Sequence, residues 1–120
     1  MYKNLEIWKF SVNLIKNVYK IAEKLPKSEE YNLKSQLKRA VVSVSLNIAE
    51  GKSRKTGKDF AHFLGISSGS LTEVEAILTI CQELKYITPD ENIFQDISKL
   101  NKQINSMRNH VLNKGNNNEK

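Results

Sequence analysis

Apolar residues recur at gaps of three and four in separate stretches of this chain, and this spacing limits the possible folds more than any other feature. It is the spacing that places side chains on one face of an α-helix. The first stretch consists of Leu5, Trp8, Val12, Ile15, Tyr19 and Ala22. The last consists of Ile93, Ile97, Leu100, Ile104, Met107 and Val111. Because 120 residues suffice for one core but not for two, we expect a single all-α domain.

Capping and helix-breaking residues divide the domain into helices. Pro26 ends the first helix. Ser28 is placed to cap the second helix and Gly51 to stop it. Thr56, followed three residues later by Asp59, resembles a capping box that opens the third helix.

The fourth helix has the clearest start in the chain, at Thr88-Pro89-Asp90-Glu91, where threonine caps and proline takes the first helical position. The predicted helices cover residues 4–24, 29–51, 57–86 and 89–113 of one domain spanning 1–113, followed by a disordered tail at 114–120. Short connections favour an antiparallel, up-down-up-down four-helix bundle.

The first and third predicted helices carry more apolar surface than one core needs. In the first helix a second group lies about 130° around the axis from the seam centred on Trp8 and Ile15. This group consists of Ile7, Phe10, Leu14, Val18 and Ile21. In the third helix one seam consists of Phe60, Leu64, Ser67, Leu71, Val74, Leu78 and Cys81. Its neighbour consists of Phe63, Ile66, Ser70, Ile77, Ile80 and Leu84. We therefore expect a symmetric homo-oligomer. The alternative is a helix wedged between its neighbours, which buries both stripes within one chain.

Polar residues interrupt the apolar faces of the second and third helices. They are Gln36, Arg39, Ser43, Asn47, Glu50, Ser70 and Glu73. Glu73 falls between Ile66 and Ile80, where a buried carboxylate would need a partner. We expect a hydrogen-bonded network that fixes helix register and subunit fit, with Glu73 linked to Arg39 or Asn47. The alternative is a polar binding site within the bundle.

Basic residues are concentrated in one part of the chain, which has a formal net charge of +6. Residues 34–58 contain seven basic side chains and one acid, whereas residues 59–97 contain seven acids and one base. The candidates for nucleic-acid binding are Lys34, Lys38, Lys52, Arg54, Lys55 and Lys58. Exposed together, they would bind phosphate backbone with strong salt dependence and little sequence preference. The alternative is a solvated loop whose lysines serve solubility.

Sequence signatures of enzymes and metalloproteins are not evident. His62 and His110 have no second His or Cys at helical ligand spacing. Cys81 continues an apolar seam, as a small buried hydrophobe does. The usual glycine-rich phosphate loop and the Glu-x-x-His pattern of di-iron bundles are both missing. We therefore expect no enzymatic activity, no metal and no cofactor.

The hydropathy of the chain also predicts where it works. No apolar run approaches the roughly 20 residues that a membrane span needs. The beginning of the sequence lacks the continuous apolar stretch of a signal peptide. We therefore expect a cytoplasmic protein with no membrane partner.

Several motifs together resemble one bacterial protein family. The motifs are Ser43-Val-Ser-Leu-Asn-Ile-Ala-Glu-Gly51, Arg54, Phe60, Phe63-Leu64, Gly69-Ser-Leu-Thr-Glu73, Leu5-Glu-Ile-Trp8 and Gln36-Leu-Lys-Arg-Ala40. Through them, residues 2–112 are similar to the 23S ribosomal RNA intervening-sequence proteins. Lys52-Ser53 departs from the family pattern, in which an aromatic residue often follows the glycine.

The resemblance implies an antiparallel four-helix bundle that assembles into a ring-like homopentamer. Family members are encoded within insertions in bacterial 23S ribosomal RNA genes or stand alone. A related branch is the accessory protein of diversity-generating retroelements, a basic pentamer that binds nucleic acid and reverse transcriptase. Two functions remain open for this chain: an assembly that binds RNA or DNA, and a scaffolding oligomer that binds a protein partner and whose basic surface is incidental.

Overall fold

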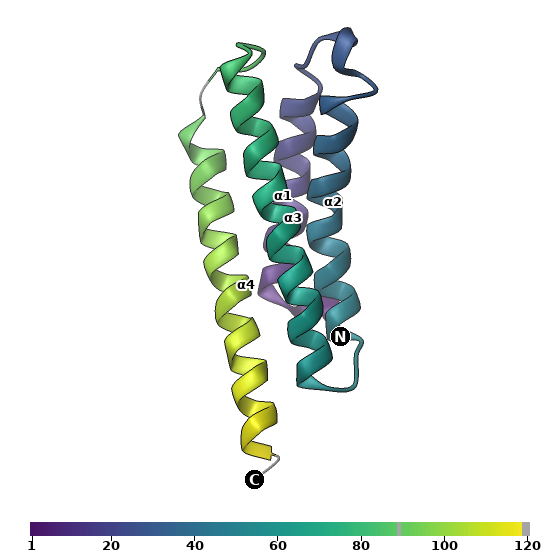
Figure 1. Cartoon of the computed structure of the whole chain (residues 1–120), viewed down its shortest axis with the longest axis vertical. Helices are drawn as coiled ribbons and strands as arrows, with labels where there is room; N and C mark the ends of the chain where they lie inside the picture. The colour runs from purple at the N-terminus through teal and green to yellow at the C-terminus, as the bar shows by residue number, and fades with distance from the viewer. Residues whose placement is uncertain (89, 119–120) are drawn as a thin grey trace.

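The computed structural model describes residues 1–88 and 90–118, with side chains described as far as residue 114, and contains four long helices. They are α1 (Glu6–Ala22), α2 (Leu33–Lys52), α3 (Gly57–Glu83) and α4 (Glu91–Asn118), with 3-10 turns at Tyr2–Asn4 and Lys27–Glu29. Successive helices run in opposite directions and pack on one another (Figure 1). No strand occurs in the described residues. The predicted all-α, up-down-up-down arrangement is therefore confirmed.

The start of α2 differs from the prediction. The expected cap, Ser28, lies in the 3-10 turn, and α2 begins only at Leu33. The carboxylate of Glu29 accepts hydrogen bonds from Asn32 Nδ2 at 3.1 Å and from Tyr86 Oη at 3.2 Å. The Tyr86 bond ties the turn to the α3–α4 connection and raises the pKa of Tyr86.

The end of α2 also differs from the prediction, because Gly51 does not stop the helix. Gly51 is helical, α2 continues to Lys52, and no described glycine has a positive φ. A Cβ atom at Gly51 would lie 2.9 Å from Phe60 Cδ1 and 3.0 Å from Phe63 Cβ. Glycine is therefore required there because α3 approaches closely. The predicted cap of α3 is confirmed, since Thr56 Oγ1 accepts a hydrogen bond from the Asp59 N–H at 3.1 Å.

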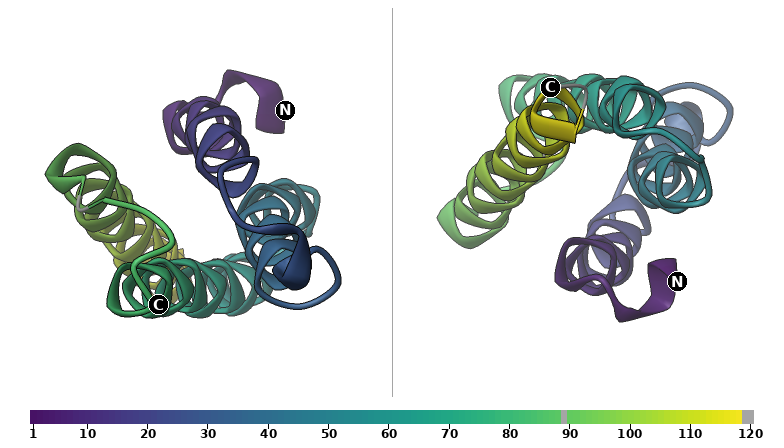
Figure 2. Two further views of the ribbon diagram at one scale, coloured as in Figure 1. Left: turned by 90° about the horizontal axis from the view of Figure 1, so that it is seen from above. Right: turned by 90° about the horizontal axis from the view of Figure 1, so that it is seen from below.

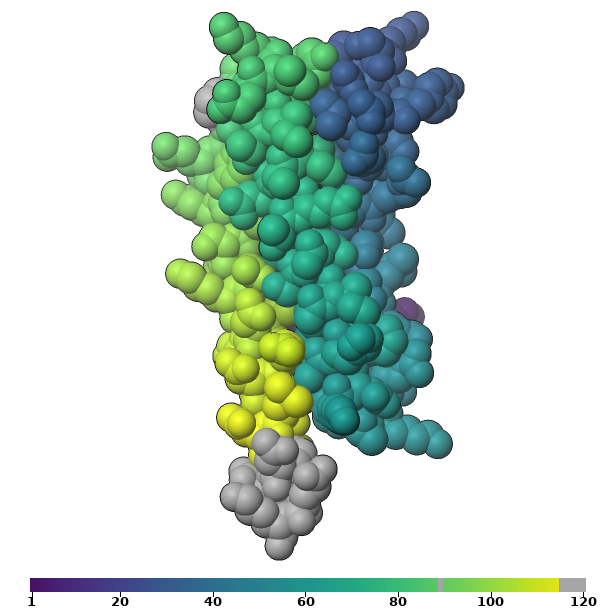
Figure 3. All heavy atoms as spheres, in the orientation of Figure 1, coloured from purple at the N-terminus to yellow at the C-terminus, as the bar shows by residue number. Residues whose placement is uncertain are grey.

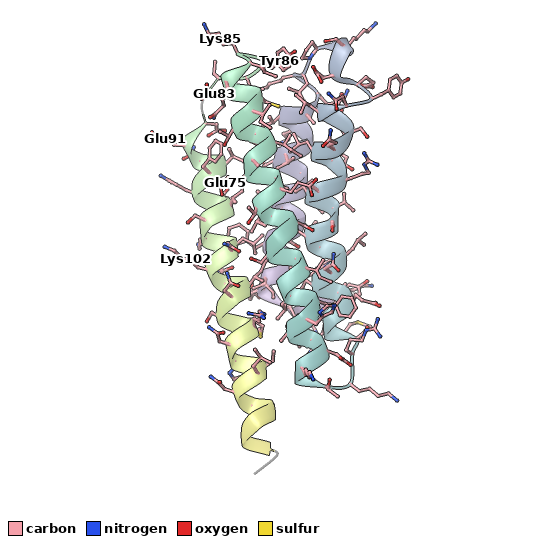
Figure 4. The ribbon with its side chains drawn as sticks, in the orientation of Figure 1. Glu75, Glu83, Lys85, Tyr86, Glu91 and Lys102 are labelled. Atoms are coloured by element: carbon pink, nitrogen blue, oxygen red, sulfur yellow. The ribbon has the colours of Figure 1, made fainter. Side chains whose placement is uncertain are left out.

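A Schellman motif ends α3 at the opposite end of the bundle. Lys85 adopts a left-handed conformation with φ of 62°. Its N–H donates to the carbonyl of Gln82, and the Tyr86 N–H donates to the carbonyl of Cys81, both at 2.9 Å. Figure 4 shows Lys85 and Tyr86 at this end of α3, just beyond Glu83. The helix thus stops three residues before the predicted boundary at residue 86.

Asp90, rather than the predicted Thr88, caps α4. The Asp90 Oδ1 atom accepts a hydrogen bond from the Asn92 N–H at 3.0 Å, so the helix begins at Glu91. Pro89, predicted in the first turn, lies outside the described residues. The helix continues past its predicted end at residue 113 to Asn118. The last residues of the predicted disordered tail, 119–120, also lie outside the described residues.

The hydrophobic core runs along the inner faces of the helices. Its largest fully buried side chains include Leu14, Leu37, Ile48, Leu64, Leu71, Leu78, Leu100 and Ile104. In α3 the buried line is the seam from Phe60 to Cys81. In α1 it is Ile7, Ser11, Leu14, Val18 and Ala22, so Trp8 and Ile15 are left only half-buried. The bundle is open on one side, because α1 and α4 pack least closely and form the two ends of a horseshoe in end-on view (Figure 2).

By length and composition alone, α3 could cross a membrane. This is weak evidence, because the core helix of a soluble bundle passes the same test. Nine residues of α3 are buried within the bundle. Part of its apolar character therefore comes from its central position, in contact with both α2 and α4.

Candidate nucleic-acid interface

Four of the six predicted nucleic-acid contacts lie together at one end of the bundle. They are Lys52, Arg54, Lys55 and Lys58, all exposed where α2 turns into α3, and we call them the basic junction. The Lys52 Nζ atom lies 6.0 Å from the centroid of the Phe60 ring, and the Arg54 guanidinium carbon lies 4.7 Å from that of Phe63. These rings attract both cations and hold them close to the junction.

One cation of the basic junction is partly neutralised. Arg54 forms an ion pair with Glu50, one turn earlier on α2, through exposed side chains. Such a pair is weak in water and does not prevent Arg54 from contacting a phosphate. Among the described side chains, Lys52, Lys55 and Lys58 form no ion pair within 4.0 Å.

A hollow of about 410 Å³ opens between the basic junction and α4, and we call it the basic hollow. The cationic and titratable residues that line it are Lys52, Arg54, Lys55, His110 and Lys114, and no carboxylate is among its described lining residues. The start of α3 and the later part of α4 lie side by side at this end in the space-filling view (Figure 3). A Cβ atom at Gly57 would lie only 2.5 Å from the Val111 carbonyl oxygen, which shows how closely the two helices approach.

The contribution of α4 was not predicted from the sequence. His110 and Lys114 are more than 50 positions from the basic junction, and only the folded bundle brings them to it. The sequence feature that could have predicted it is charge composition, because residues 97–114 contain four basic side chains and no acid. A charge count extended beyond residue 97 would have found this second basic segment.

Lys34 and Lys38 lie apart from the basic junction. Lys34 is about 27 Å from Lys52 along α2, at 1.5 Å per residue. The Lys34 Nζ atom lies 2.8 Å from Glu30 Oε2 and 3.2 Å from Glu23 Oε2, and Lys38 Nζ lies 2.9 Å from Glu23 Oε1. Lys38 and Lys34 lower the pKa of Glu23, and Glu30 and Glu23 raise the pKa of Lys34. These two lysines therefore join α1 to α2 and are not part of the cationic cluster at the other end.

The predicted polar network forms in part. Ser43 Oγ and Ser70 Oγ are hydrogen-bonded at 2.8 Å and join α2 to α3. Asn47 Nδ2 donates to the Ser43 carbonyl at 2.9 Å and to Ser43 Oγ at 3.0 Å. This part of the network lies at the contact between the two helices and is half-buried. Its bonds fix the register of α2 against α3.

The other members of the predicted network have separate contacts. Gln36 Nε2 donates to Asn32 Oδ1 at 2.8 Å, and Glu50 pairs with Arg54. Arg39 and Glu73 are exposed. Within the described part of the single chain, Glu73 forms no hydrogen bond or ion pair with Arg39 or Asn47, so the expected link is not made there.

An apolar stripe remains exposed along α3. Ile66, Ile80 and Leu84 are 41%, 46% and 50% exposed, and Glu73 lies on the same helix face. We call these four residues the outer stripe. The alternative in which one chain buries both seams of α3 is therefore wrong. On α1, Trp8 and Ile15 are half-buried, so part of its first seam also remains accessible.

Neither the arrangement of possible metal ligands nor the position of Cys81 supports metal-binding or thiol chemistry in the described residues. Across residues 1–88 and 90–118, no group of three or more His, Cys, Asp or Glu side chains is placed to hold a metal ion. Cys81 is buried in the α3 seam, and burial raises the pKa of its thiol.

Comparison with known proteins identifies the family. Residues 3–110 match the family described as 23S rRNA-intervening sequence protein. The chain belongs to this family. A crystal structure of a protein of unknown function from the S23 ribosomal protein family of Bacteroides thetaiotaomicron shares 26% identity, with a TM-score of 0.74. The similarity covers 85% of this chain and 97% of that chain. No curated protein matches the chain. The resemblance recognised in the sequence is thus confirmed.

The sequence block that suggested the 23S rRNA-intervening sequence family has a structural explanation in this chain. Within the block, Asn47 bonds to Ser43, Ile48 is fully buried in the core, and Glu50 pairs with Arg54. Gly51 provides the space in which Phe60 packs. The block therefore builds the α2–α3 corner that carries the basic junction.

Proposed function

We propose that this member of the family is a non-catalytic, self-associating cytoplasmic protein that binds the phosphate backbone of RNA or DNA through the basic junction. The observation that best supports this function is the basic hollow, which gathers cations from the junction and from α4 without a carboxylate in its described lining. A site of this composition attracts polyanions through charge, with affinity that falls steeply as salt rises. Contacts to phosphate carry no sequence information, so sequence preference would be weak.

Self-association is supported by the outer stripe. An assembly that covers Ile66, Ile80 and Leu84 would remove their apolar surface from water, at about 25 cal/mol per Å² buried. Glu73 would then need a cation from the neighbouring subunit, because an unpaired buried carboxylate is costly. The family resemblance leads us to expect a ring of five subunits. Such a ring would repeat the basic junction around its axis and strengthen the field that a polyanion meets.

Charge-removal variants test this function. The junction variant carries Lys52→Gln, Lys55→Gln and Lys58→Gln. The matched control carries Lys24→Gln, Lys27→Gln and Lys85→Gln, three exposed lysines near the opposite end of the bundle. Binding of fluorescent single-stranded RNA and duplex DNA is measured by anisotropy over a range of salt concentrations, and light scattering checks that the mass of the assembly is unchanged.

The junction variant should bind more weakly than the control, with a salt slope shallower by about 2 to 3, because each lost phosphate contact removes about 0.7 to 0.9. Equal losses in the two variants would show that total charge, and not the junction, drives binding. Absence of binding to the unmodified protein at low salt would refute the nucleic-acid function. The outer stripe would then favour a scaffolding role with a protein partner.

A further inference from the structure

We infer that the basic hollow is one end of a longer track for a single strand of nucleic acid, which continues along α4 into the groove between α1 and α4. The inference rests on the proposed function, because the basic junction would hold one end of the strand. It adds the length of the site, its course and the class of nucleic acid that fits.

The α1–α4 groove lies on the open side of the bundle and has a volume of about 620 Å³. It exists because α1 and α4 pack least closely of the neighbouring helices (Figure 2). Its charged lining residues are Lys9, Lys16, Lys20, Lys99, Glu6 and Asp96. Four cations against two carboxylates leave the groove with a net charge of +2. The groove is therefore attractive to a polyanion in its own right.

A third hollow connects the groove to the basic hollow. It has a volume of about 470 Å³ and lies on α4, where Lys102 and Ser106 contribute to its lining. It shares Gln103 with the α1–α4 groove, and it shares Met107 and His110 with the basic hollow. The three hollows therefore follow one another down a single face of α4, and a ligand could lie along all of them without leaving the surface.

The length of this track sets the number of nucleotides it can hold. From Asp96 to Lys114 the track follows α4 for about 27 Å, at 1.5 Å per residue. A stacked strand spaces its phosphates by about 3.4 Å, so the track spans about eight nucleotides. Lys99, Lys102 and Lys114 lie along this path, and the carboxylates Glu6 and Asp96 occur only in the lining of the α1–α4 groove. Positive charge is thus distributed along the course of the strand.

The shape of the groove favours a single strand over a duplex. The major groove of duplex DNA is about 12 Å wide and admits a whole α-helix. Because its major groove alone holds an α-helix, the whole duplex is wider than an α-helix. It is therefore too wide to enter a groove bounded by two helices of one bundle. Half-buried Phe10 lines this groove, with Lys99 Nζ 5.6 Å from the centroid of its ring. A cation beside an aromatic face is the combination that sequence-independent single-strand binding sites use.

Self-association through the apolar seams would leave this track open. Ile15 on the first seam of α1 and Lys16 in the groove are separated by about 100° around the helix axis. The outer stripe of α3 lies on a helix that does not line the α1–α4 groove. The assembly and the strand would thus use different faces of the chain.

A groove variant tests the track. It carries Lys16→Gln, Lys20→Gln and Lys99→Gln, and its matched control is the variant with Lys24→Gln, Lys27→Gln and Lys85→Gln. All six residues are exposed, and each variant changes the charge by the same amount. The probes are fluorescent oligothymidylates shorter and longer than about eight nucleotides, and a duplex of the longer length. Light scattering confirms that each variant assembles like the unmodified protein.

The unmodified protein and the control should bind oligothymidylate more tightly as it lengthens to about eight nucleotides. The groove variant should lose this gain and show a salt slope shallower by about 2, since each single-strand phosphate contact contributes about 0.7. Duplex binding should be the same in both variants. If the groove variant binds long oligothymidylate like the control while the junction variant is impaired, the track is wrong and the proposed function stands. If the unmodified protein binds none of the probes, the proposed function fails and the track fails with it.

Discussion

Gly51 is packed beneath the aromatic side chains of α3, and its missing side chain allows α2 to turn into α3 within a few residues. The nearest atoms to an added Cβ would be the ring of Phe60, its carbonyl oxygen and the Cβ of Phe63, all within 3.2 Å. Backbone and Cβ atoms cannot move aside as the end of a flexible side chain can. The corner that carries the basic junction therefore depends on glycine at this position.

The Gly51→Ala variant should lower the free energy of unfolding by about 1 to 3 kcal/mol, the usual range for overpacking a well-packed site. Gly65→Ala is the control, because its Cβ would lie 3.6 Å from Arg108 Nε, an ordinary contact with a flexible side chain. That substitution should raise stability by up to about 1 kcal/mol through helix propensity. Urea denaturation of both variants measures the difference. Equal stabilisation by both alanines would contradict the close approach at Gly51.

Single residues also show where sequence patterns reach their limit. Gly51 was identified as important from its position after an apolar helix, but its role as a stop was wrong, because the pattern does not reveal what packs on it. The sequence places Glu30 one turn before Lys34 but does not show that Glu23 also reaches Lys34. Only the packing of α1 on α2 brings Glu23 to Lys34 and leaves Lys52 in a hollow with His110. Such distinctions depend on tertiary contacts that residue spacing does not contain.

At the scale of the helices, α3 has the most clearly defined ends. Thr56 caps its first turn, and Lys85 closes its last turn in a left-handed conformation. Between these ends the Ser67 Oγ donates to the Val44 carbonyl at 2.8 Å, which is possible only because α2 and α3 approach closely. The register of α3 thus positions both the basic junction and the outer stripe.

Removal of the cap at Thr56 should destabilise the protein. In Thr56→Ala the N–H of Asp59 loses its side-chain acceptor, and the free energy of unfolding should fall by about 1 kcal/mol. Thr72→Ala in the same helix is the control. Thr72 Oγ1 donates to the Ser68 carbonyl, which the helix backbone already uses as a hydrogen-bond acceptor. Loss of the Thr72 hydroxyl should therefore change stability little. If thermal denaturation shows the same change in both variants, Thr56 contributes nothing as a cap.

The core of α3 followed from apolar spacing, whereas the core of α1 followed from it only in part. All seven residues of the first seam predicted for α3 are buried. In α1 the buried line passes through Ser11, which donates to the Trp8 carbonyl and shares a 2.6 Å hydrogen bond with Ser45. A polar residue in the core is invisible to a hydrophobic pattern. Its partner on another helix, which makes its burial tolerable, can be found only in the structure.

At the scale of the whole molecule, apolar and charged surfaces are arranged in different places. The outer stripe runs along α3, whereas the basic hollow is at one end and the α1–α4 groove is on the open side. The second apolar seam of α3 was predicted from the sequence and is exposed in part in the single chain, at Ile66, Ile80 and Leu84. The openness between α1 and α4 was not predicted, because all helices of a bundle have the same apolar periodicity whether or not the bundle closes.

A charge within the outer stripe should prevent assembly without unfolding the chain. The Ile80→Lys variant should have the 13.7 kDa mass of one chain by light scattering, with the helical circular dichroism signal retained. Tyr31→Lys is the control, because Tyr31 is 96% exposed and lies in a turn. The control should keep the mass of the assembly. A mass of one chain for the unmodified protein would contradict self-association.

The central claim, that this protein holds nucleic-acid backbone by charge, is tested most directly by the salt dependence of its affinity for single-stranded RNA. The account predicts measurable binding at low salt and a linear fall of the logarithm of the association constant with the logarithm of the salt concentration. With three or more phosphates neutralised, the slope should be about −2 or steeper. No binding at low salt, or an affinity that does not change with salt, would contradict the claim.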